Sequence, residues 1–186
     1  MELFDAIYNR RAVRDYTDAV VPRATLMTLL NAAVQAPSAM NSQPWAFAVV
    51  TDRARLKDFS DRAKAHFLTL LTPDSPLFGH RDMLSDPATN IFYNAGTLVI
   101  FCAKQAGLEP GEDCSLAAQN LMLAAHASGL GTCPIGLARP WLNLPETKSE
   151  LGIPADDQPV FPVIVGFPAG PTPAVARRDP EIVRWI

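Results

Sequence analysis

The stretch Gln35-Ala36-Pro37-Ser38-Ala39-Met40-Asn41-Ser42-Gln43-Pro44-Trp45 separates a helical pattern from a run typical of a strand. Its two prolines fix φ and withhold backbone donors, and each disfavours helical backbone at the residue before it. We therefore predict a stiff, extended turn that displays polar side chains. These side chains both donate and accept hydrogen bonds, which suits a flat ligand with polar edges such as a flavin or a base. An ordinary connection, whose Ser and Asn satisfy their own backbone, is the alternative.

Helices and strands are predicted on both sides of this stretch. Apolar residues at helical spacing mark five helices, over residues 2–9, 22–35, 53–70, 113–128 and 145–151. Short apolar runs mark three strands, over residues 46–50, 97–103 and 160–166. We expect the first to be buried and the second to be central in its sheet. Asp52 is a plausible N-cap for the third helix, and Pro162 places the first half of the last strand at an edge or in a bulge.

Two further segments have no clear periodicity. Residues 72–90 are punctuated by proline and glycine, and loops of this length are usually functional lids or disordered segments. Residues 129–136 form a second glycine-rich turn, where backbone can approach a ligand closely. An ordinary connection from helix to strand explains that turn equally well.

Composition limits the classes of function. The 186 residues are enough for one domain, and a net charge of −3 provides no overall basic field for nucleic acid or an anionic membrane. No apolar run is long enough to span a bilayer, and no secretory signal is visible at the N-terminus, so we expect a cytoplasmic protein. The three cysteines and three histidines have no metal-ligand spacing, and we expect no metal site.

Three arginines, Arg10, Arg11 and Arg14, follow the first helix within five positions. A guanidinium presents a fixed fork of donors that matches phosphate oxygens. The cluster therefore predicts a phosphate site. A solvated basic turn near a helix C-terminus is the alternative.

Three motifs in this order resemble the FMN-dependent nitroreductase family, nearly end to end. The arginine turn is similar to its phosphate-binding segment, residues 36–45 look like its most diagnostic motif, and residues 118–133 resemble its dimer helix and flavin-facing loop. The resemblance implies an α+β three-layer sandwich with a mixed, mostly antiparallel sheet. It implies one domain over 1–186 in an intertwined homodimer, with a C-terminal arm (about 167–186) that crosses to the partner.

The resemblance also implies roles for individual residues. Arg10 and Arg14 would hold the FMN phosphate together with Arg178, and Arg11 would reach the phosphate or the pyrimidine edge. Residues of the partner chain would line the ribityl chain and ring: Pro37, Ser38 and Asn41, with Gln43 as a further contact. Residues packed against the isoalloxazine would be Pro134, Ile135 and Gly136, the last with its N–H toward flavin N5.

The sequence departs from the family pattern at several positions. Ala12 stands where many relatives carry a Ser that touches the phosphate, and Gly136 replaces the acidic residue of the best-known branch. Asn90 is the candidate for that branch's pyrimidine-contacting Asn, and Ile91 stands about where its Lys would be. Recognition of the flavin's O2 and N3 is therefore open.

The implied chemistry is hydride transfer from NAD(P)H to flavin N5, then reduction of a small-molecule acceptor such as a nitroaromatic or a quinone. The two substrates would use one place in turn, which gives ping-pong kinetics. No side chain is required as a nucleophile or general acid, and we name none. Two alternatives stay open: a specialised branch (dehalogenation, flavin cleavage, or enal and semialdehyde reduction) and a flavin-binding protein without turnover.

Overall fold

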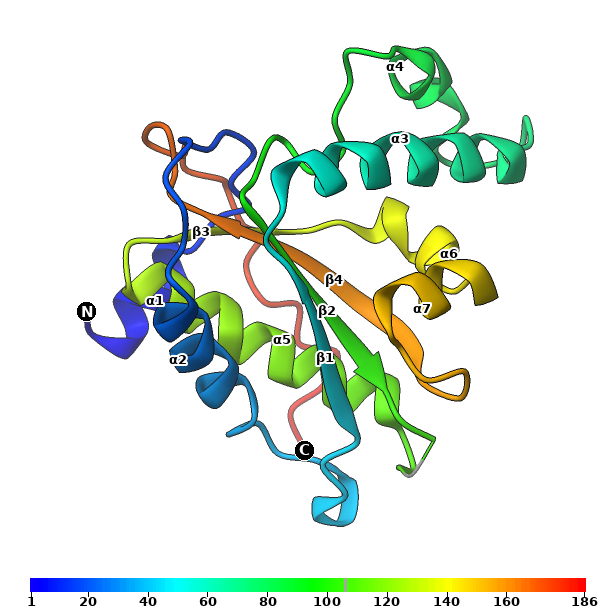
Figure 1. Ribbon diagram of the computed structural model, residues 1–186. Coiled ribbons are helices and arrows are strands. Elements are labelled where there is room, and N and C mark those ends of the chain that lie inside the picture. Colours follow the sequence, from blue (N-terminus) through cyan, green and yellow to red (C-terminus); the bar gives the residue numbers. More distant parts are fainter. Residues whose placement is uncertain (106) are drawn as a thin grey trace.

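A four-stranded sheet forms the middle layer of the computed structural model, which describes residues 1–105 and 107–186 (Figure 1). Its strands are β1 (Trp45–Val50), β2 (Thr97–Ala103), β3 (Gly131–Pro134) and β4 (Gln158–Gly166). They lie in the order β1-β2-β4-β3, and each neighbouring pair is antiparallel. All seven residues of β2 are buried, which confirms the predicted central strand.

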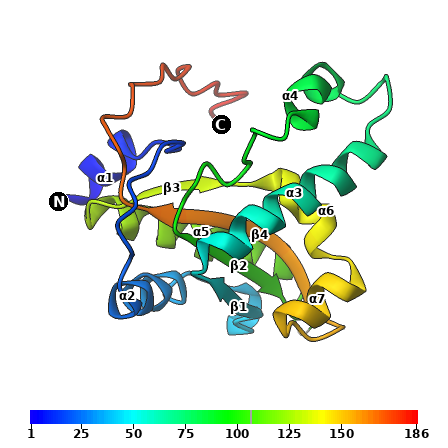
Figure 2. The ribbon, with the colours of Figure 1, turned by 45° about the horizontal axis from the view of Figure 1, so that its top comes forward.

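Helices cover both faces of the sheet (Figures 1 and 2). One face carries α3 (Arg53–Leu70), α6 (Arg139–Leu142) and α7 (Pro145–Leu151), and the other carries α2 (Arg23–Ala33) and α5 (Pro110–Ala127). Smaller elements lie at the margins: α1 (Leu3–Asn9), η1 (Ala39–Asn41), η2 (Phe78–His80), α4 (Arg81–Ser85) and η3 (Gly136–Ala138). This arrangement confirms the expected three-layer α+β fold.

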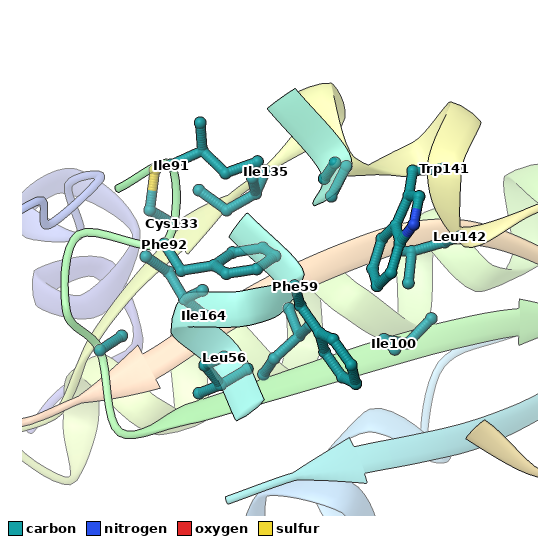
Figure 3. Packing of buried hydrophobic residues seen from close by; sticks show 14 of the residues in the cluster. Leu56, Phe59, Ile91, Phe92, Ile100, Cys133, Ile135, Trp141, Leu142 and Ile164 are labelled. Carbon is teal, nitrogen blue, oxygen red and sulfur yellow. The ribbon is translucent and has the colours of Figure 1, made fainter. Parts of the chain in front are cut away.

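The alternation of side chains along β2 divides the core into two clusters. Leu98 and Ile100 face α3 and α6, whereas Val99 and Phe101 face α2 and α5. Figure 3 shows the first cluster, in which Phe59 of α3 packs against Trp141 with ring centroids 5.1 Å apart. The two central strands, β2 and β4, are therefore largely buried on both faces of the sheet.

Several elements differ from the sequence prediction. The first strand, β1, is a partly exposed edge strand and not a buried one, because among the described residues it pairs only with β2. Residues 131–134 form β3, which the glycine pattern had suggested only as a turn. The helix predicted from residue 113 already begins at Pro110, because proline suits the first turn of a helix. Segment 72–90 contains η2 and α4.

Two local predictions about capping and sheet irregularity are confirmed. The Asp52 carboxylate accepts a hydrogen bond from the Arg55 backbone N–H at 3.1 Å, so Asp52 caps α3. Val160 is the extra residue of a bulge beside Pro162, because Phe101 faces Phe161 while the next residue of β2 already faces Pro159.

Among the described residues, none of the helices combines the length and hydropathy needed to cross a bilayer.

Candidate functional site

The arginine-rich segment after α1 is held against the edge of the sheet. The Val13 N–H donates to the Thr132 carbonyl at 3.0 Å, and Ala12 forms a parallel bridge with Thr132 of β3. The Tyr16 hydroxyl closes this segment by donating to the Val13 carbonyl at 2.7 Å. These bonds fix the backbone from which the neighbouring arginines project.

Beside this segment lies a cavity of about 630 Å³. Three of its lining residues are Arg10, Arg11 and Arg14, and the start of the C-terminal tail closes the other side with Gly170 and Arg177. Burial lowers the pKa of Arg10, and repulsion from Arg177 and Arg11 lowers it further. Four arginines and one carboxylate, Asp15, line the cavity, so it has an excess of positive charge that an anionic ligand such as a phosphate would relieve.

The tail arginine that lines this cavity is Arg177, and the neighbouring Arg178 is not among the lining residues. The family resemblance implied Arg178 for this role, and no local feature of the sequence distinguishes the two adjacent arginines. The path of the tail decides which of these two arginines lines the cavity. That path is set by Thr17, whose N–H donates to the Phe167 carbonyl at 2.9 Å, and by the Ala169 N–H, which donates to the Asp15 carbonyl at 3.1 Å.

The polar stretch before β1 is a tight turn rather than the extended turn that the prolines predicted. Met40, Asn41 and Gln43 adopt left-handed backbone, with φ of 52°, 54° and 47°. Ser38 Oγ accepts from the Gln43 N–H at 2.9 Å, and Gln43 Nε2 donates to Asn41 Oδ1 at 3.1 Å. The base of the stretch is buried and its tip, including Pro37 and Asn41, is exposed.

One chain does not bring this loop and the arginines together. The loop leads into Trp45, which pairs with Ala103 at one end of β2, while Thr97 at the other end pairs with Val165. Val165 in turn pairs with Thr132, where the arginine segment lies. A strand of seven residues spans roughly 20 Å, so the two groups lie at opposite ends of the sheet, as Figure 1 shows. A site built from both groups needs two copies of the chain.

The predicted flavin-facing residues Pro134, Ile135 and Gly136 join β3 to η3. In the part of the chain that the structure describes, the Gly136 N–H has no hydrogen-bond partner. No atom lies within 4 Å of the position that a Cβ would take at Gly136. Gly136 is thus exposed with its N–H unpaired in the described part of the chain, while Ile135 is buried beside it.

Asn90 is engaged within its own turn. Its Oδ1 accepts from the Phe92 N–H at 2.9 Å, and its Nδ2 donates to Asn94 Oδ1 at 2.9 Å. The turn places the ring of Tyr93 beneath Arg14, with 5.9 Å between the guanidinium carbon and the ring centroid. The sequence prediction missed Tyr93, because no pattern links an aromatic residue there to an arginine so far away in the chain.

Two other polar side chains near the arginines are unsuited to nucleophilic or acid chemistry. Burial raises the pKa of the Cys133 thiol, although Arg14 and Arg10 oppose the shift. Burial, Arg10 and Arg11 lower the pKa of His126. At neutral pH Cys133 is therefore a thiol and His126 is uncharged.

Comparison with known proteins shows to which family this chain belongs. A model of the Nitroreductase family matches residues 7–167. An Archaeoglobus fulgidus protein, named as an inferred NADH dehydrogenase/NAD(P)H nitroreductase, is 32% identical over 90% of this chain and 86% of its own length. The iodotyrosine deiodinase of Thermotoga neapolitana is 29% identical over 98% of this chain and 97% of its own. A solved nitroreductase with bound FMN from Bacteroides fragilis has a TM-score of 0.83 and 26% identity, and covers 100% of this chain and 98% of that one. The chain therefore belongs to the Nitroreductase family.

Proposed function

We propose that this protein is an FMN-dependent oxidoreductase that takes hydride from NAD(P)H and reduces nitroaromatic, quinone or similar acceptors by a ping-pong mechanism. The observation that carries the proposal is the arginine-lined cavity beside β3. The bound FMN of the Bacteroides fragilis protein and the NAD(P)H in the name of the Archaeoglobus fulgidus relative support it. We expect the protein to act in the cytoplasm.

The residues present fit the phosphate end of FMN. A cavity of about 630 Å³ is of the size that cofactors occupy. Among the described residues, none of Arg10, Arg14 and Arg177 forms an ion pair with a carboxylate, so their charges are available to a ligand. The Arg11 Nε is buried and has no hydrogen-bond partner among the described residues. It is therefore a further donor to which a ligand could bind.

Each of the chain's residues has a limited task in this proposal. Bound FMN supplies the redox chemistry, accepting hydride and passing electrons to the acceptor. Arg10, Arg14 and Arg177 bind and orient the phosphate end. Pro134 and Ile135 would pack against the flavin ring, and the Gly136 N–H would offer a hydrogen bond at the flavin edge. Asn90 supports the turn under Arg14 through Tyr93, rather than offering a free amide.

The protein acts as a homodimer in this proposal, and the separation of the loop and the arginines within one chain supports it. In the proposed dimer, the partner's loop with its Pro37, Ser38, Asn41 and Gln43 would complete the flavin site. Residues 169–186 are all exposed, and Figure 2 shows this tail leaving the sheet. Its end is apolar, with Val183 98% exposed and Trp185 84% exposed. We propose that a second copy covers it, as in the intertwined arrangement that the family resemblance implies.

Flavin reduction provides the test. The purified protein should be yellow, and NADH or NADPH should bleach it within seconds without oxygen. A yellow protein that neither nucleotide bleaches would favour a storage or sensing role, and a colourless one that does not bind added FMN would exclude both roles.

The deiodinase relative favours one second candidate, reductive dehalogenation. Reoxidation of the bleached protein by 3-iodotyrosine, compared with a quinone and a nitroaromatic, would separate the two.

A further inference from the structure

The loop at Ser38–Gln43 is held in a conformation that it would not keep by itself. Three non-glycine residues in left-handed backbone are unfavourable, and such strain persists only where the surrounding structure imposes it. The bonds among Ser38, Asn41 and Gln43 fix the loop's internal shape. They do not fix its orientation relative to the rest of the molecule, so an external anchor is needed.

That anchor is Asp113 in the first turn of α5. Its carboxylate accepts from the Ala39 N–H, with Oδ1 at 3.2 Å and Oδ2 at 3.4 Å, across 74 positions of sequence. Asp113 is only 4% exposed. A buried carboxylate is costly unless hydrogen bonds and favourable dipoles offset the loss of water, and here the Ala39 N–H and the N-terminus of an 18-residue helix provide both.

A second bond holds the other end of the loop. The Pro44 carbonyl accepts from the Lys104 N–H at 2.7 Å, which ties the loop's exit to the end of β2. Asp113 ties its entrance to α5. The tip between these two bonds, including Met40 and Asn41, is exposed.

We infer that Asp113 is a positioning residue: by holding Ala39 against α5, it sets the direction in which Ser38 and Asn41 face the flavin of the partner subunit. This inference rests on the proposed function and adds a residue that does not itself touch the cofactor. At a given distance, a carboxylate is a stronger hydrogen-bond acceptor than a neutral oxygen. The carboxylate therefore holds the loop more firmly than an amide in the same place would.

The test compares Asp113→Ala and Asp113→Asn with Asp52→Ala. The last variant is a matched control, because Asp52 also accepts a backbone N–H near the start of a helix but lies far from the loop in the fold. Without FMN, Asp113→Ala should raise the hydrogen-exchange rate of residues 38–43 at least 10-fold. Asp113→Asn should raise it less, since its amide oxygen can still accept. Asp52→Ala should leave that segment unchanged.

With FMN, Asp113→Ala should weaken binding at least 10-fold in a fluorescence titration and change the visible circular dichroism of the bound flavin. The FMN affinity and the flavin dichroism of Asp113→Asn should lie between those of Asp113→Ala and those of the parent. Parental exchange rates and parental flavin dichroism in both variants would overturn the inference. If Asp113→Ala does not fold, the same exchange and dichroism measurements on Asp113→Asn alone decide whether the inference holds. A parent that binds no FMN would overturn the proposed function, whereas the exchange measurement would still decide whether Asp113 anchors the loop.

Discussion

Arg14 stacks over Tyr93, with its guanidinium carbon 5.9 Å from the ring centroid. Tyr93 has left-handed backbone, with φ of 51°, inside the turn that Asn90 closes. A guanidinium over an aromatic face is attracted by the ring's quadrupole and loses some of its freedom to swing into solvent. The turn after segment 72–90 thus helps to aim an arginine at the cavity.

This contact predicts different outcomes for two substitutions at one position. Tyr93→Phe keeps the ring and should bind FMN like the parent. Tyr93→Leu removes the ring, and a partly exposed cation–π contact contributes about 0.5–1 kcal/mol, so the Kd should rise about 2- to 5-fold. Fluorescence titration of the apoprotein measures both. Equal affinities for the Leu and Phe variants would show that the stacking does not orient Arg14.

The adjacent tail arginines provide a matched pair. Arg177→Ala should weaken FMN binding about 10-fold or more, since a hydrogen bond to a charged group contributes about 1.5–3 kcal/mol. Arg178→Ala should change it little, because Arg178 does not line the cavity. The loss in Arg177→Ala should be largest at low salt, where charges are least screened. The reverse order of the two variants would mean that the tail takes another path in the dimer.

Individual buried elements could be read from the sequence because apolar periodicity reports burial directly, whereas their arrangement in layers was implied only by the family resemblance. The fully buried β2 and the amphipathic α3 are examples. The short β3 could not be recognised, since its four residues carry the glycine and proline of a turn. Its strand character comes from pairing with β4 and with Ala12, which is a property of the assembled sheet.

The candidate site was predictable only in part, for a similar reason. Arg10 and Arg14 stand out because charge is crowded into a short segment. Asp113, Tyr93 and Arg177 act through contacts with residues far away in the sequence, and nothing local distinguishes them. The family resemblance suggested Asn90 as the pyrimidine-contacting Asn, but its side chain is hydrogen-bonded within its own turn.

Gly131 allows the arginine segment to pass close to β3, and this predicts a stability effect. A Cβ at Gly131 would lie 2.7 Å from Val13 Cβ. Overpacking of this kind typically costs about 1–3 kcal/mol, so Gly131→Ala should lower the melting temperature by several degrees and displace Arg14. Gly111→Ala in α5 is the control, because nothing lies within 4 Å of its Cβ position. An unchanged melting temperature for Gly131→Ala would show that Val13 can move aside.

His126 predicts how the apoprotein responds to acid. Its pKa in the folded state is lowered by burial and by Arg10 and Arg11. The unfolded chain therefore binds a proton more readily, and stability should fall as the pH drops below about 6.5, the ordinary pKa of His. The loss ends once the pH passes below the folded pKa. His126→Gln should flatten this part of the curve of unfolding free energy against pH. An unchanged slope would assign the acid sensitivity to other groups.

In the proposed dimer, the apolar end of the tail contributes to both dimerisation and flavin binding, so a change there should weaken both together. Removing the whole arm would also remove Arg177, so the sharper change is Trp185→Ser in the full-length chain. Trp185 is 84% exposed, and covering a large aromatic side chain is worth about 1.5–3 kcal/mol. Light scattering should then find the dimer dissociating at about 10-fold higher concentration or more, with FMN released in parallel. Leu70→Ser, at the exposed end of α3, removes a comparable apolar group far from the tail and should alter neither property. A Trp185→Ser protein that stays dimeric and yellow at the lowest measurable concentration would show that the end of the arm does not hold the partner.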